Sequence, residues 1–467
     1  MNESRSTIKM STEKINDILS KIKTEKIVRV HFQFVDILGN LKSVGVPTET
    51  SENLKDFKEH LEEGVGFDGS SVLGFVRIAE SDLVLKPNLD TFKVFPWRGE
   101  NFSEGRLICN VLHPSGLPFE GDPIYVLKKA EDRLEEKLGK GMRYNVAPEI
   151  EFFLFEMDGE MTTQQIKTDV YGYFDYTPLY KASIALNKAM RYMQDLGLIL
   201  YKDHHEVANS QYEINFKYDV AFETAINFIY YKLCLKTAAL ESDLYASFMP
   251  KPIFGINGSG SHTHQSIFNA KGENVFFDPD EEDYHLSDTA RHFLAGQLKY
   301  VREITAVTNP TVNSYKRLTP GYEAPVYVCW GRRNRSALVR VPQDFPGKEK
   351  ATRLEGRWPD PSMNPFLGFA VMLEAGLQGI MDKEKLRDSV EEDVYHFDDA
   401  KLEKFYIKTL PGSLGEAVEL MENSKNKIAR NALGDFAFDK LTEALKAQWD
   451  AYRIRVHQWE LDKYLST

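Results

Sequence analysis

The sequence predicts an α+β protein with a smaller N-terminal domain and a larger C-terminal domain. Three observations lead to this fold class. The 467 residues exceed one typical domain, residues 27–47 contain two β-type segments, and helical segments alternate with strand-like segments after residue 123. Hydrophobic residues make up 42% of the chain, which is enough for a full core. Proline and glycine cluster before residue 123, so we expect domains over residues 1–118 and 119–467.

In the first domain, residues 1–24 predict an amphipathic helix. The segments IVRVHFQFVDILGN and LKSVGVP predict two strands, and Gly39-Asn40 between them predicts the turn of a hairpin. Residues 51–64 have the pattern of a second helix. The next segment, GVGFDGSSVLGF, is rich in glycine and serine and therefore predicts a loop.

In the second domain, three helices are predicted by the segments IYVLKKAEDRLEEKL, KASIALNKAMRYMQDLG and FETAINFIYYKLCLKTAAL. These helices alternate with strands that carry glutamates and histidines. From about Pro365 the chain is mainly helical. The sequence has no internal repeat, low-complexity tract or coiled-coil heptad run.

Acidic residues and histidines of the second domain form a pattern that is typical of a metal centre. Residues two apart on a strand point to the same face, so Glu149 and Glu151 of PEIEFFLF project together. The same spacing places His262 beside His264 in NGSGSHTH. The expected metal ligands are Glu149, Glu151, Glu206, Glu213, His262 and Glu355.

Two further segments complete this pattern. Glu206 and Glu213 are seven residues apart, but the Ala208-Asn209-Ser210 segment predicts a turn, which would place the two glutamates on facing strands of a hairpin. In TRLEGRW, Glu355 shares one strand face with the arginines on either side of it.

Five carboxylates and one imidazole suit a hard divalent cation such as Mg²⁺ or Mn²⁺ better than Zn²⁺ or Ca²⁺. Two such ions can neutralise charge at both ends of a phosphoryl transfer. From Lys316 to Arg357 the chain has ten Lys or Arg against four Asp or Glu, although its overall net charge is −12. A basic stretch in an acidic protein is expected where anionic substrates bind.

The composition disfavours several other classes of protein. The net charge of −12 argues against a nucleic-acid-binding protein. The longest apolar runs are too short for a membrane span, and the polar N-terminus has no hydrophobic signal region. Cys109, Cys234 and Cys329 lack metal-ligand spacing and suit a reducing compartment. We therefore expect a cytoplasmic protein with neither a nucleic-acid nor a membrane partner.

Seven segments together resemble type I glutamine synthetase, with motifs of its alpha subtype. They occur in family order over most of the chain: FDGSS, PEIEFFLF, HHEVANSQYE, NGSGSHTHQS, NSYKRLTPGYEAPV, RNRSALVRVP and RLEGRWPDPSMNP. The resemblance implies an N-terminal β-grasp domain and a catalytic domain in which helices surround a curved antiparallel sheet. It also implies a homo-dodecamer of two hexameric rings with active sites shared between subunits. A nitrogen-signalling protein is a further candidate partner.

The implied activity is the ATP-dependent condensation of L-glutamate with ammonia to L-glutamine through a γ-glutamyl phosphate, the reaction of ammonia assimilation. Mg²⁺ or Mn²⁺ would be the cofactor, with two or more ions per subunit, and ATP would be the co-substrate. The resemblance assigns one group of ligands to the ion nearer glutamate, namely Glu151, Glu206 and Glu213. The ion on the nucleotide side would be held by Glu149, His262 and Glu355.

The resemblance also implies roles for residues around these ions. Asp68 would take a proton from ammonium, and Glu323 would close a flap that keeps water from the acyl-phosphate. The expected ammonium site is Asp68, Ser71, Tyr173 and Glu206. The expected glutamate contacts are Asn257, Gly258, Arg317, Glu323, Arg335 and Arg357, of which Arg317 and Arg357 also face the transferred phosphoryl group. The expected nucleotide contacts are His264, Ser266, Arg335, Arg340, Lys350 and Arg353.

Three positions concern regulation or depart from the family pattern. Arg77 in GFVRI resembles an arginine that the alpha subtype uses in glutamine feedback, so an alanine there should abolish inhibition by glutamine. Tyr201 stands where the family usually has an acidic residue, which affects the expected nucleotide contacts. Tyr395 lies near the position of an adenylylated tyrosine of the beta subtype, but its neighbours differ, and we expect no adenylylation.

Two other functions remain open from the sequence. The same fold could join glutamate to a small amine other than ammonia, although the complete set of ammonium residues favours ammonia. The chain could also be a non-catalytic scaffold or sensor. All six metal ligands, the flap glutamate and the arginines are present, which argues against lost catalysis.

Overall fold

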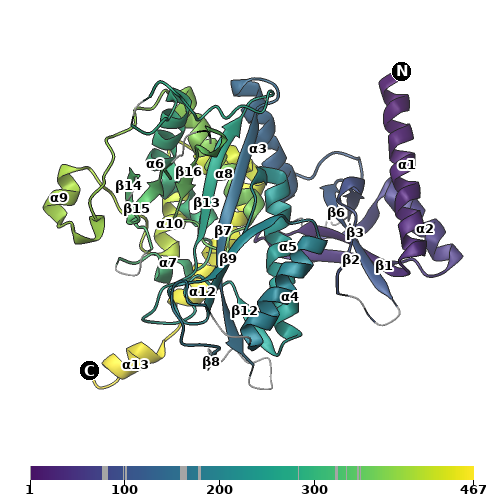
Figure 1. The fold of residues 1–467 in the computed structure, drawn as a ribbon, viewed down its shortest axis with the longest axis horizontal. Coiled ribbons are helices and arrows are strands. Elements are labelled where there is room, and N and C mark those ends of the chain that lie inside the picture. The colour runs from purple at the N-terminus through teal and green to yellow at the C-terminus, as the bar shows by residue number, and fades with distance from the viewer. Residues whose placement is uncertain are drawn as a thin grey trace.

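The computed structural model describes residues 2–75, 82–97, 99, 102–157, 166–176, 180–281, 283–320, 324–332, 334–343, 347 and 349–467. The chain forms two domains, each with its own sheet. In Figure 1 the N-terminal domain lies on the right in purple, and the larger domain lies to its left with the C-terminal end at the lower left. Arg77 and Glu323, which we predicted to act in feedback and in the flap, lie outside the described residues.

The N-terminal domain is a mixed sheet covered by two helices. The strand order is β2-β1-β6-β4-β3, with β5 paired to β6, and β1 runs parallel to β6 while the other pairs are antiparallel. Its helices and strands are α1 (Asn2–Thr24), β1 (Ile27–Val35), β2 (Leu41–Pro47), α2 (Ser51–Glu63), β3 (Val65–Asp68), β4 (Asp82–Pro87), β5 (Lys93–Val94) and β6 (Ser103–Leu112).

The structure confirms the predicted hairpin and both predicted helices of this domain. The turn between β1 and β2 contains Gly39 at φ +86°, a conformation that glycine adopts without strain. A Cβ atom there would lie 2.8 Å from Cα of Asn364, so the glycine also permits close contact with the second domain. The Asn364 amide donates to the carbonyl of Asp36 at 3.1 Å, which helps to fix the hairpin on the catalytic domain.

The predicted glycine- and serine-rich loop is partly wrong. Its first residues form the edge strand β3, in which Val65 pairs with Leu85 and Phe67 with Leu83. Apolar side chains at alternate positions pack into the domain core, and this outweighs the low strand propensity of the glycines. A short 3₁₀ turn follows at Gly69–Ser71.

The larger domain is built on a long sheet with the order β14-β15-β16-β13-β7-β10-β9, and β8, β11 and β12 also pair with β7. Its strands are β7 (Arg143–Glu156), β8 (Ile166–Lys167), β9 (Leu200–His205), β10 (Gln211–Phe216), β11 (Asp219–Val220), β12 (Leu244–Ser247), β13 (Ser261–Phe268), β14 (Tyr327–Gly331), β15 (Ala337–Arg340) and β16 (Leu354–Gly356). The predicted curved antiparallel sheet is confirmed, except that β14 and β15 are parallel.

Helices surround this sheet, as predicted (Figure 1). They are α3 (Pro123–Leu138), α4 (Lys181–Asp195), α5 (Ala221–Leu240), α6 (Asp288–Thr308), α7 (Ser314–Arg317), α8 (Pro365–Met381), α9 (Asp399–Lys404), α10 (Leu414–Glu422), α11 (Ile428–Leu433), α12 (Asp435–Arg453) and α13 (Gln458–Tyr464). Helices α3 and α5 pack on β7, and α8 packs against both of them. The predicted domain boundary, between residues 118 and 119, falls between β6 and α3 and stays a prediction.

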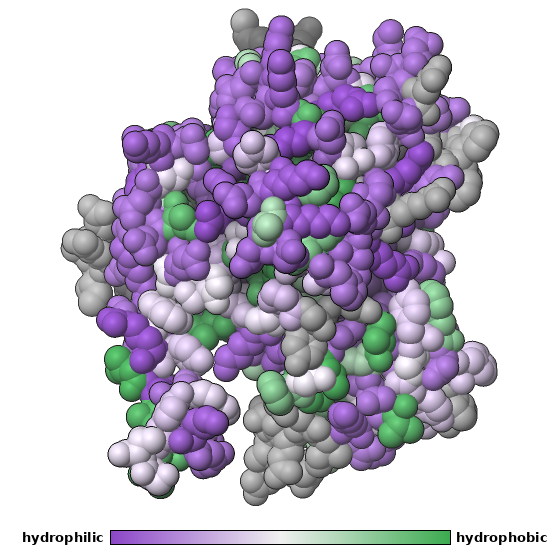
Figure 2. Space-filling view, turned by 90° about the vertical axis from the view of Figure 1, so that its left-hand side faces the viewer, coloured by the Kyte–Doolittle hydropathy of each residue, from purple (hydrophilic) through white to green (hydrophobic). Residues whose placement is uncertain are grey.

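The surface is mainly polar. Figure 2 shows a face of the molecule that is largely hydrophilic, with scattered hydrophobic residues. Among the described residues, no helix has the length and apolar character needed to cross a membrane. All three cysteines are buried free thiols.

Candidate active site

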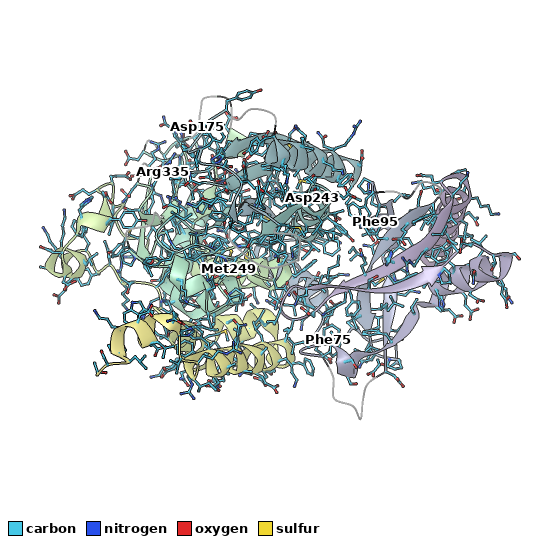
Figure 3. The ribbon with its side chains drawn as sticks, turned by 90° about the horizontal axis from the view of Figure 1, so that it is seen from below. Phe75, Phe95, Asp175, Asp243, Met249 and Arg335 are labelled. Carbon is cyan, nitrogen blue, oxygen red and sulfur yellow. The ribbon has the colours of Figure 1, made fainter. Side chains whose placement is uncertain are left out.

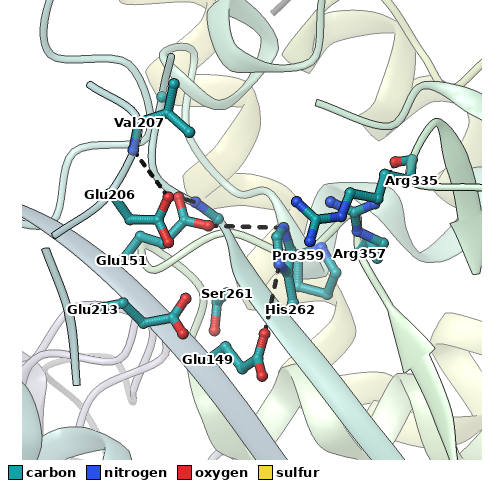
Figure 4. A network of polar contacts seen from close by, with 12 residues as sticks. Glu149, Glu151, Glu206, Val207, Glu213, Ser261, His262, Arg335, Arg357 and Pro359 are labelled. Atoms are coloured by element: carbon teal, nitrogen blue, oxygen red, sulfur yellow. Dashed lines mark hydrogen bonds and ion pairs between the residues drawn. The ribbon is translucent and has the colours of Figure 1, made fainter. Parts of the chain in front are cut away.

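Strand β7 provides the centre of the site. Its residue Glu149 lies opposite His262 of β13, and Glu151 lies opposite Glu213 of β10. Because side chains of directly opposed residues project from the same face of a sheet, these four side chains gather on one side. Figure 4 shows them turned toward one another beside Glu206. The predicted shared face of Glu149 and Glu151 is therefore confirmed.

The hairpin that carries Glu206 and Glu213 also has the predicted form. Strands β9 and β10 are antiparallel, and Glu206 follows directly after the end of β9. The backbone N–H of Glu206 donates to the carbonyl of Gln211 at 2.8 Å, and Ser210 in the turn has a φ of +64°. The turn brings Glu206 back toward Glu213, so both carboxylates face the same cavity.

One cluster of metal-type ligands consists of Glu149, His262 and Glu355. One ligand atom from each lies within 4.8 Å of the others. Nδ1 of His262 is 4.0 Å from a carboxylate oxygen of each glutamate, which is too long for a hydrogen bond. Such spacing suits atoms that each reach a shared cation at about 2 Å. The donor set therefore fits Mg²⁺ or Mn²⁺.

A second cluster consists of His204, Glu206 and Glu213. Nε2 of His204 lies 3.0 Å from Oε1 of Glu206. Glu151, which the resemblance assigned to this ion, stands between the two clusters, with Oε1 3.9 Å from Nε2 of His262. Its Oε2 accepts hydrogen bonds from the N–H of Gly260 at 2.9 Å and from the amide of Gln211 at 3.0 Å. These donors fix one oxygen and leave the other facing the cavity.

Burial and neighbouring groups shift the pKa values of these carboxyls in opposite directions. Burial, together with the charge of Glu206, raises the pKa of Glu151 to about 8. Burial and the charges of Glu149 and Glu151 raise the pKa of Glu213 well above its usual range. Burial alone would raise the pKa of Glu149, but the charge and hydrogen bond of His264 lower it. Repulsion between these neighbouring carboxylates disfavours their charged forms, and a bound cation would relieve it.

His262 has the protonation state that a metal ligand needs. Burial, with the charge of Arg357, lowers the pKa of His262 well below its ordinary value. The imidazole is therefore neutral at neutral pH and has a lone pair to offer a cation.

We expect the stability of the metal-free protein to fall as the pH is raised between about 5 and 8. The carboxyl of Glu151 has an ordinary pKa of 4.5 and a pKa of about 8 in the folded protein. Between these values the folded state holds a proton that the unfolded chain has lost, so each rise in pH favours unfolding. Melting temperatures in chelator from pH 5.5 to 8.5 would measure this. A Glu151→Gln variant should show a flatter slope, and a wild-type slope no steeper than that of the variant would contradict the prediction.

Arginines form the opposite wall of the cavity. The lining includes Arg317, Arg335, Arg340 and Arg357. Nη1 of Arg340 is 2.9 Å from Oε2 of Glu355, and Nε of Arg357 is 3.4 Å from Oε1 of the same glutamate. Arg317 is buried and donates to the carbonyls of Trp358, Pro359 and Arg357. Arg317 therefore also holds the segment after β16 in place.

The residues predicted to bind nucleotide are only partly gathered. Nε2 of His264 lies 3.1 Å from Oε1 of Glu149, and its Nδ1 accepts from Nε of Arg353 at 3.2 Å. Ser266 is buried on the same strand, and Lys350 is exposed in a 3₁₀ turn. Neither lines the acidic cavity. Burial raises the pKa of Tyr201 to about 12, and the nearby charges of Glu149 and Glu213 contribute to this rise.

The predicted ammonium residues divide between two places. Tyr173 and Glu206 line the cavity together with the predicted glutamate residues Asn257 and Gly258. Asp68 ends β3 in the N-terminal domain, is exposed, and accepts from the N–H and hydroxyl of Ser70. Figure 3 shows Phe75, seven residues later, on the opposite side of the molecule from Arg335. Neither Asp68 nor Ser71 lines the cavity of its own chain.

Sequence reasoning missed His204, Gln211 and Gly260. His204 lies opposite Glu213, so alternation along the DHHE segment contained a signal for it. Gln211 donates to Glu151 and to the carbonyl of Gly258. No pattern in the sequence indicated the roles of Gln211 and Gly260, because they act through contacts with distant segments.

The fold and the cavity together define a two-domain protein. Its cavity has an acidic centre suited to divalent cations and a wall of arginines. The glutamine synthetase catalytic-domain model matches residues 120–464, and the model of the glutamine synthetase β-grasp domain matches residues 26–114. Glutamine synthetase of Methanosarcina mazei is 44% identical over 450 residues, which are 96% of this chain and 97% of that protein. Glutamine synthetase of Thermus thermophilus is 45% identical, with 97% and 98% covered. The chain belongs to the glutamine synthetase family.

Solved structures agree with this assignment. A GmaS–ADP complex has a TM-score of 0.83 and 30% identity, with 96% of this chain and 99% of that chain covered. A cryo-EM structure of Plasmodium falciparum glutamine synthetase has a TM-score of 0.81 with 96% and 98% covered, and at 22% identity it shows the fold alone. The family and the β-grasp domain predicted from the motifs are confirmed.

Proposed function

We propose that the chain joins L-glutamate to ammonia at the expense of ATP and forms L-glutamine through a γ-glutamyl phosphate. One observation carries this proposal: both acidic clusters and four arginines line a single cavity in a member of the glutamine synthetase family. Family membership supports the use of ATP and a divalent metal. Two or more Mg²⁺ or Mn²⁺ ions per subunit are the finer proposal.

The residues at the two ends of the cavity would hold different ions. Glu149, His262 and Glu355 would hold one ion beside the arginine wall, and Glu206, Glu213 and Glu151 would hold the other near Asn257. When bound, these ions would neutralise phosphate and carboxylate oxygens during phosphoryl transfer. Arg340 and Arg357 already lie at Glu355, so they are positioned to stabilise negative charge that spreads over the transferred phosphoryl group.

The reaction is tested by phosphate release from ATP with Mg²⁺ and glutamate, comparing ammonium with methylamine, ethylamine and ethanolamine at equal concentrations. We expect ammonium to be preferred and glutamine to be the product. Preference for a larger amine would replace the proposal with a γ-glutamyl-amine ligase. No turnover with any amine would favour a scaffold or sensor.

We further propose that the chain forms a homo-dodecamer of two hexameric rings with shared active sites. Membership of the family supports oligomerisation in general. The position of Asp68 supports active sites that are shared between subunits. A carboxylate predicted to capture ammonium lies outside the cavity of its own chain. A neighbouring subunit would then contribute Asp68 and Ser71 to the cavity that contains Tyr173 and Glu206. A nitrogen-signalling partner and a cytoplasmic location remain parts of the proposal.

Replacing Asp68 by asparagine should lower glutamine formation about 100-fold and spare much of the glutamate-dependent ATP hydrolysis, because the amide cannot accept the proton of ammonium. Parallel assays of phosphate and glutamine would measure this. If both activities fall together, the role of Asp68 is wrong.

Shared sites can be tested with the same variant. Mixing equal amounts of Asp68→Asn and Glu149→Gln subunits and reassembling them should restore about a quarter of the sites, since some interfaces then combine two intact partners. Absence of any recovery after verified mixing would argue that each subunit builds its own site.

A further inference from the structure

A buried carboxylate behind the Glu206 hairpin has no part in the function proposed so far. Asp169 is 8% exposed, and it lies in the segment between β8 and α4. Six groups donate hydrogen bonds to it. The donors to Oδ1 are Nε2 of His205 at 3.1 Å, the N–H of Ser210 at 2.8 Å and the N–H of Tyr171 at 3.3 Å. The donors to Oδ2 are the hydroxyls of Tyr180 at 3.0 Å, Thr168 at 3.4 Å and Tyr212.

Asp169 is tied to Glu206 through one histidine. Nδ1 of His205 lies 2.7 Å from the carbonyl of Glu206, while its Nε2 contacts Asp169. Both acceptors can only accept, so both ring nitrogens donate. The bond from the N–H of Ser210 holds the other end of the hairpin turn to the same carboxylate. The main chain on each side of Glu206 is therefore fixed by Asp169.

The same carboxylate fixes the segment that carries Tyr173. Asp169 accepts from the N–H of Tyr171, and the carbonyl of Tyr171 accepts from the amide of Asn209 in the hairpin turn at 3.0 Å. The N–H of Phe174 donates to the carbonyl of His205 at 3.1 Å. These bonds hold the 168–174 segment against the hairpin. The segment includes Tyr173, which lines the cavity together with Glu206.

The network is well suited to hold a precise geometry. Hydrogen bonds from His205 and Tyr212 keep the pKa of Asp169 well below its ordinary value, although burial would raise it. A charged acceptor such as Asp169, which has six donors, makes stronger hydrogen bonds than neutral pairs do. Neither the turn nor the Tyr173 segment is held by a regular strand ladder on both sides, so side-chain bonds decide where they lie.

We propose that Asp169 is a positioning residue that fixes the positions of Glu206 and Tyr173 relative to each other. Glu206 would bind the metal, and Tyr173 would bind ammonium. Asp169 does not line the acidic cavity and acts only through His205, the turn and the Tyr171 segment. The inference rests on the proposed function. Partners behind metal ligands commonly change metal affinity by about 10- to 100-fold when they are removed.

The test uses Asp169→Asn in the full-length protein. Calorimetric titration with Mn²⁺ and no substrate should show one class of ion bound about 10- to 100-fold more weakly than in the wild type. The KM for ammonium should rise more than the KM for ATP, because Tyr173 and Glu206 stand at one end of the cavity. A Tyr180→Phe variant removes a donor to Asp169 but no bond to the hairpin turn, and it should change Mn²⁺ affinity less.

A second buried aspartate gives the matched control. Asp122 directly precedes α3 and accepts hydrogen bonds from the N–H groups of Val111 and Ile124. Asp122 does not line the cavity. Asp122→Asn should alter the melting temperature and leave Mn²⁺ affinity within about twofold. If Asp169→Asn does not fold, Asn209→Ala removes the bond to Tyr171, together with a longer, exposed bond from Nζ of Lys167 at 3.4 Å, and should raise the KM for ammonium about 2- to 10-fold.

The outcomes separate the two proposals. If wild-type protein binds no Mn²⁺, the proposed metal-dependent function fails, and the positioning role fails with it. If the wild type binds Mn²⁺ and Asp169→Asn binds it equally well with an unchanged KM for ammonium, only the positioning role is overturned. The same result with Asn209→Ala would overturn it where Asp169→Asn is unstable.

Discussion

A Glu149→Gln enzyme should lose about 100- to 1,000-fold in kcat/KM for ATP. Glutamine keeps the size of the side chain and removes its charge. One cluster would then have one carboxylate instead of two beside His262, and the contact of Nε2 of His264 with Oε1 of Glu149 at 3.1 Å would lose its charged acceptor. Because neutral amides bind Mg²⁺ more weakly than carboxylates do, the phosphates of the nucleotide would lose their counter-charge.

Initial rates over a range of Mg²⁺ and ATP concentrations would measure the effect. Glu156→Gln is the matched control, since Glu156 ends the same strand and does not line the cavity. The control should change kcat/KM less than about threefold, because Glu156 is half-buried and lies outside the cavity. Unchanged metal-dependent kinetics in Glu149→Gln would remove Glu149 from the metal site.

The second large effect is expected from Gly260→Ala. A Cβ atom at this position would lie 2.6 Å from Nη2 of Arg317 and 2.8 Å from Nε2 of His262. Arg317 is held by three carbonyls and cannot retreat without breaking them. The methyl group would therefore displace His262 or the backbone N–H that binds Glu151. We expect a cost of about 1–3 kcal/mol in stability and a loss of about 100-fold in activity.

Melting temperature, kcat and Mn²⁺ affinity should be measured together for this variant. Gly412→Ala is the control, because a Cβ atom there would meet only Oε2 of Glu416, at 3.7 Å. It should leave all three quantities nearly unchanged. If Gly260→Ala behaves like Gly412→Ala, the tight packing around His262 does not limit the site.

The local elements could be predicted because their signals are short-range. Alternation predicted that Glu149 and Glu151 share a face, and the Ala208-Asn209-Ser210 turn predicted the hairpin around Glu206. The edge strand β3 was missed because its glycines lower strand propensity, and only pairing with β4 reveals the packing that compensates for this. The parallel pairing of β14 with β15 was also missed, although β14 ends at Gly331 and β15 begins at Ala337, close by in the chain.

Other features required the assembled fold. Gln211 and Gly260 become donors to Glu151 only when β7, β10 and the segment before β13 meet. Asp169 shows no motif, yet it receives six hydrogen bonds from four separate stretches. The position of Asp68 away from its own cavity also emerged only in three dimensions.

The sequence by itself determined the family, the helices and hairpins, and the identities of six candidate metal ligands, because periodicity and motif spacing are properties of neighbouring residues. Only the tertiary structure decided which ligands share a cluster, which carboxylates hold a raised pKa, and which side chains fix them in place. These properties depend on burial and on distances between segments that are remote in the chain, and charges interact through space rather than along the sequence.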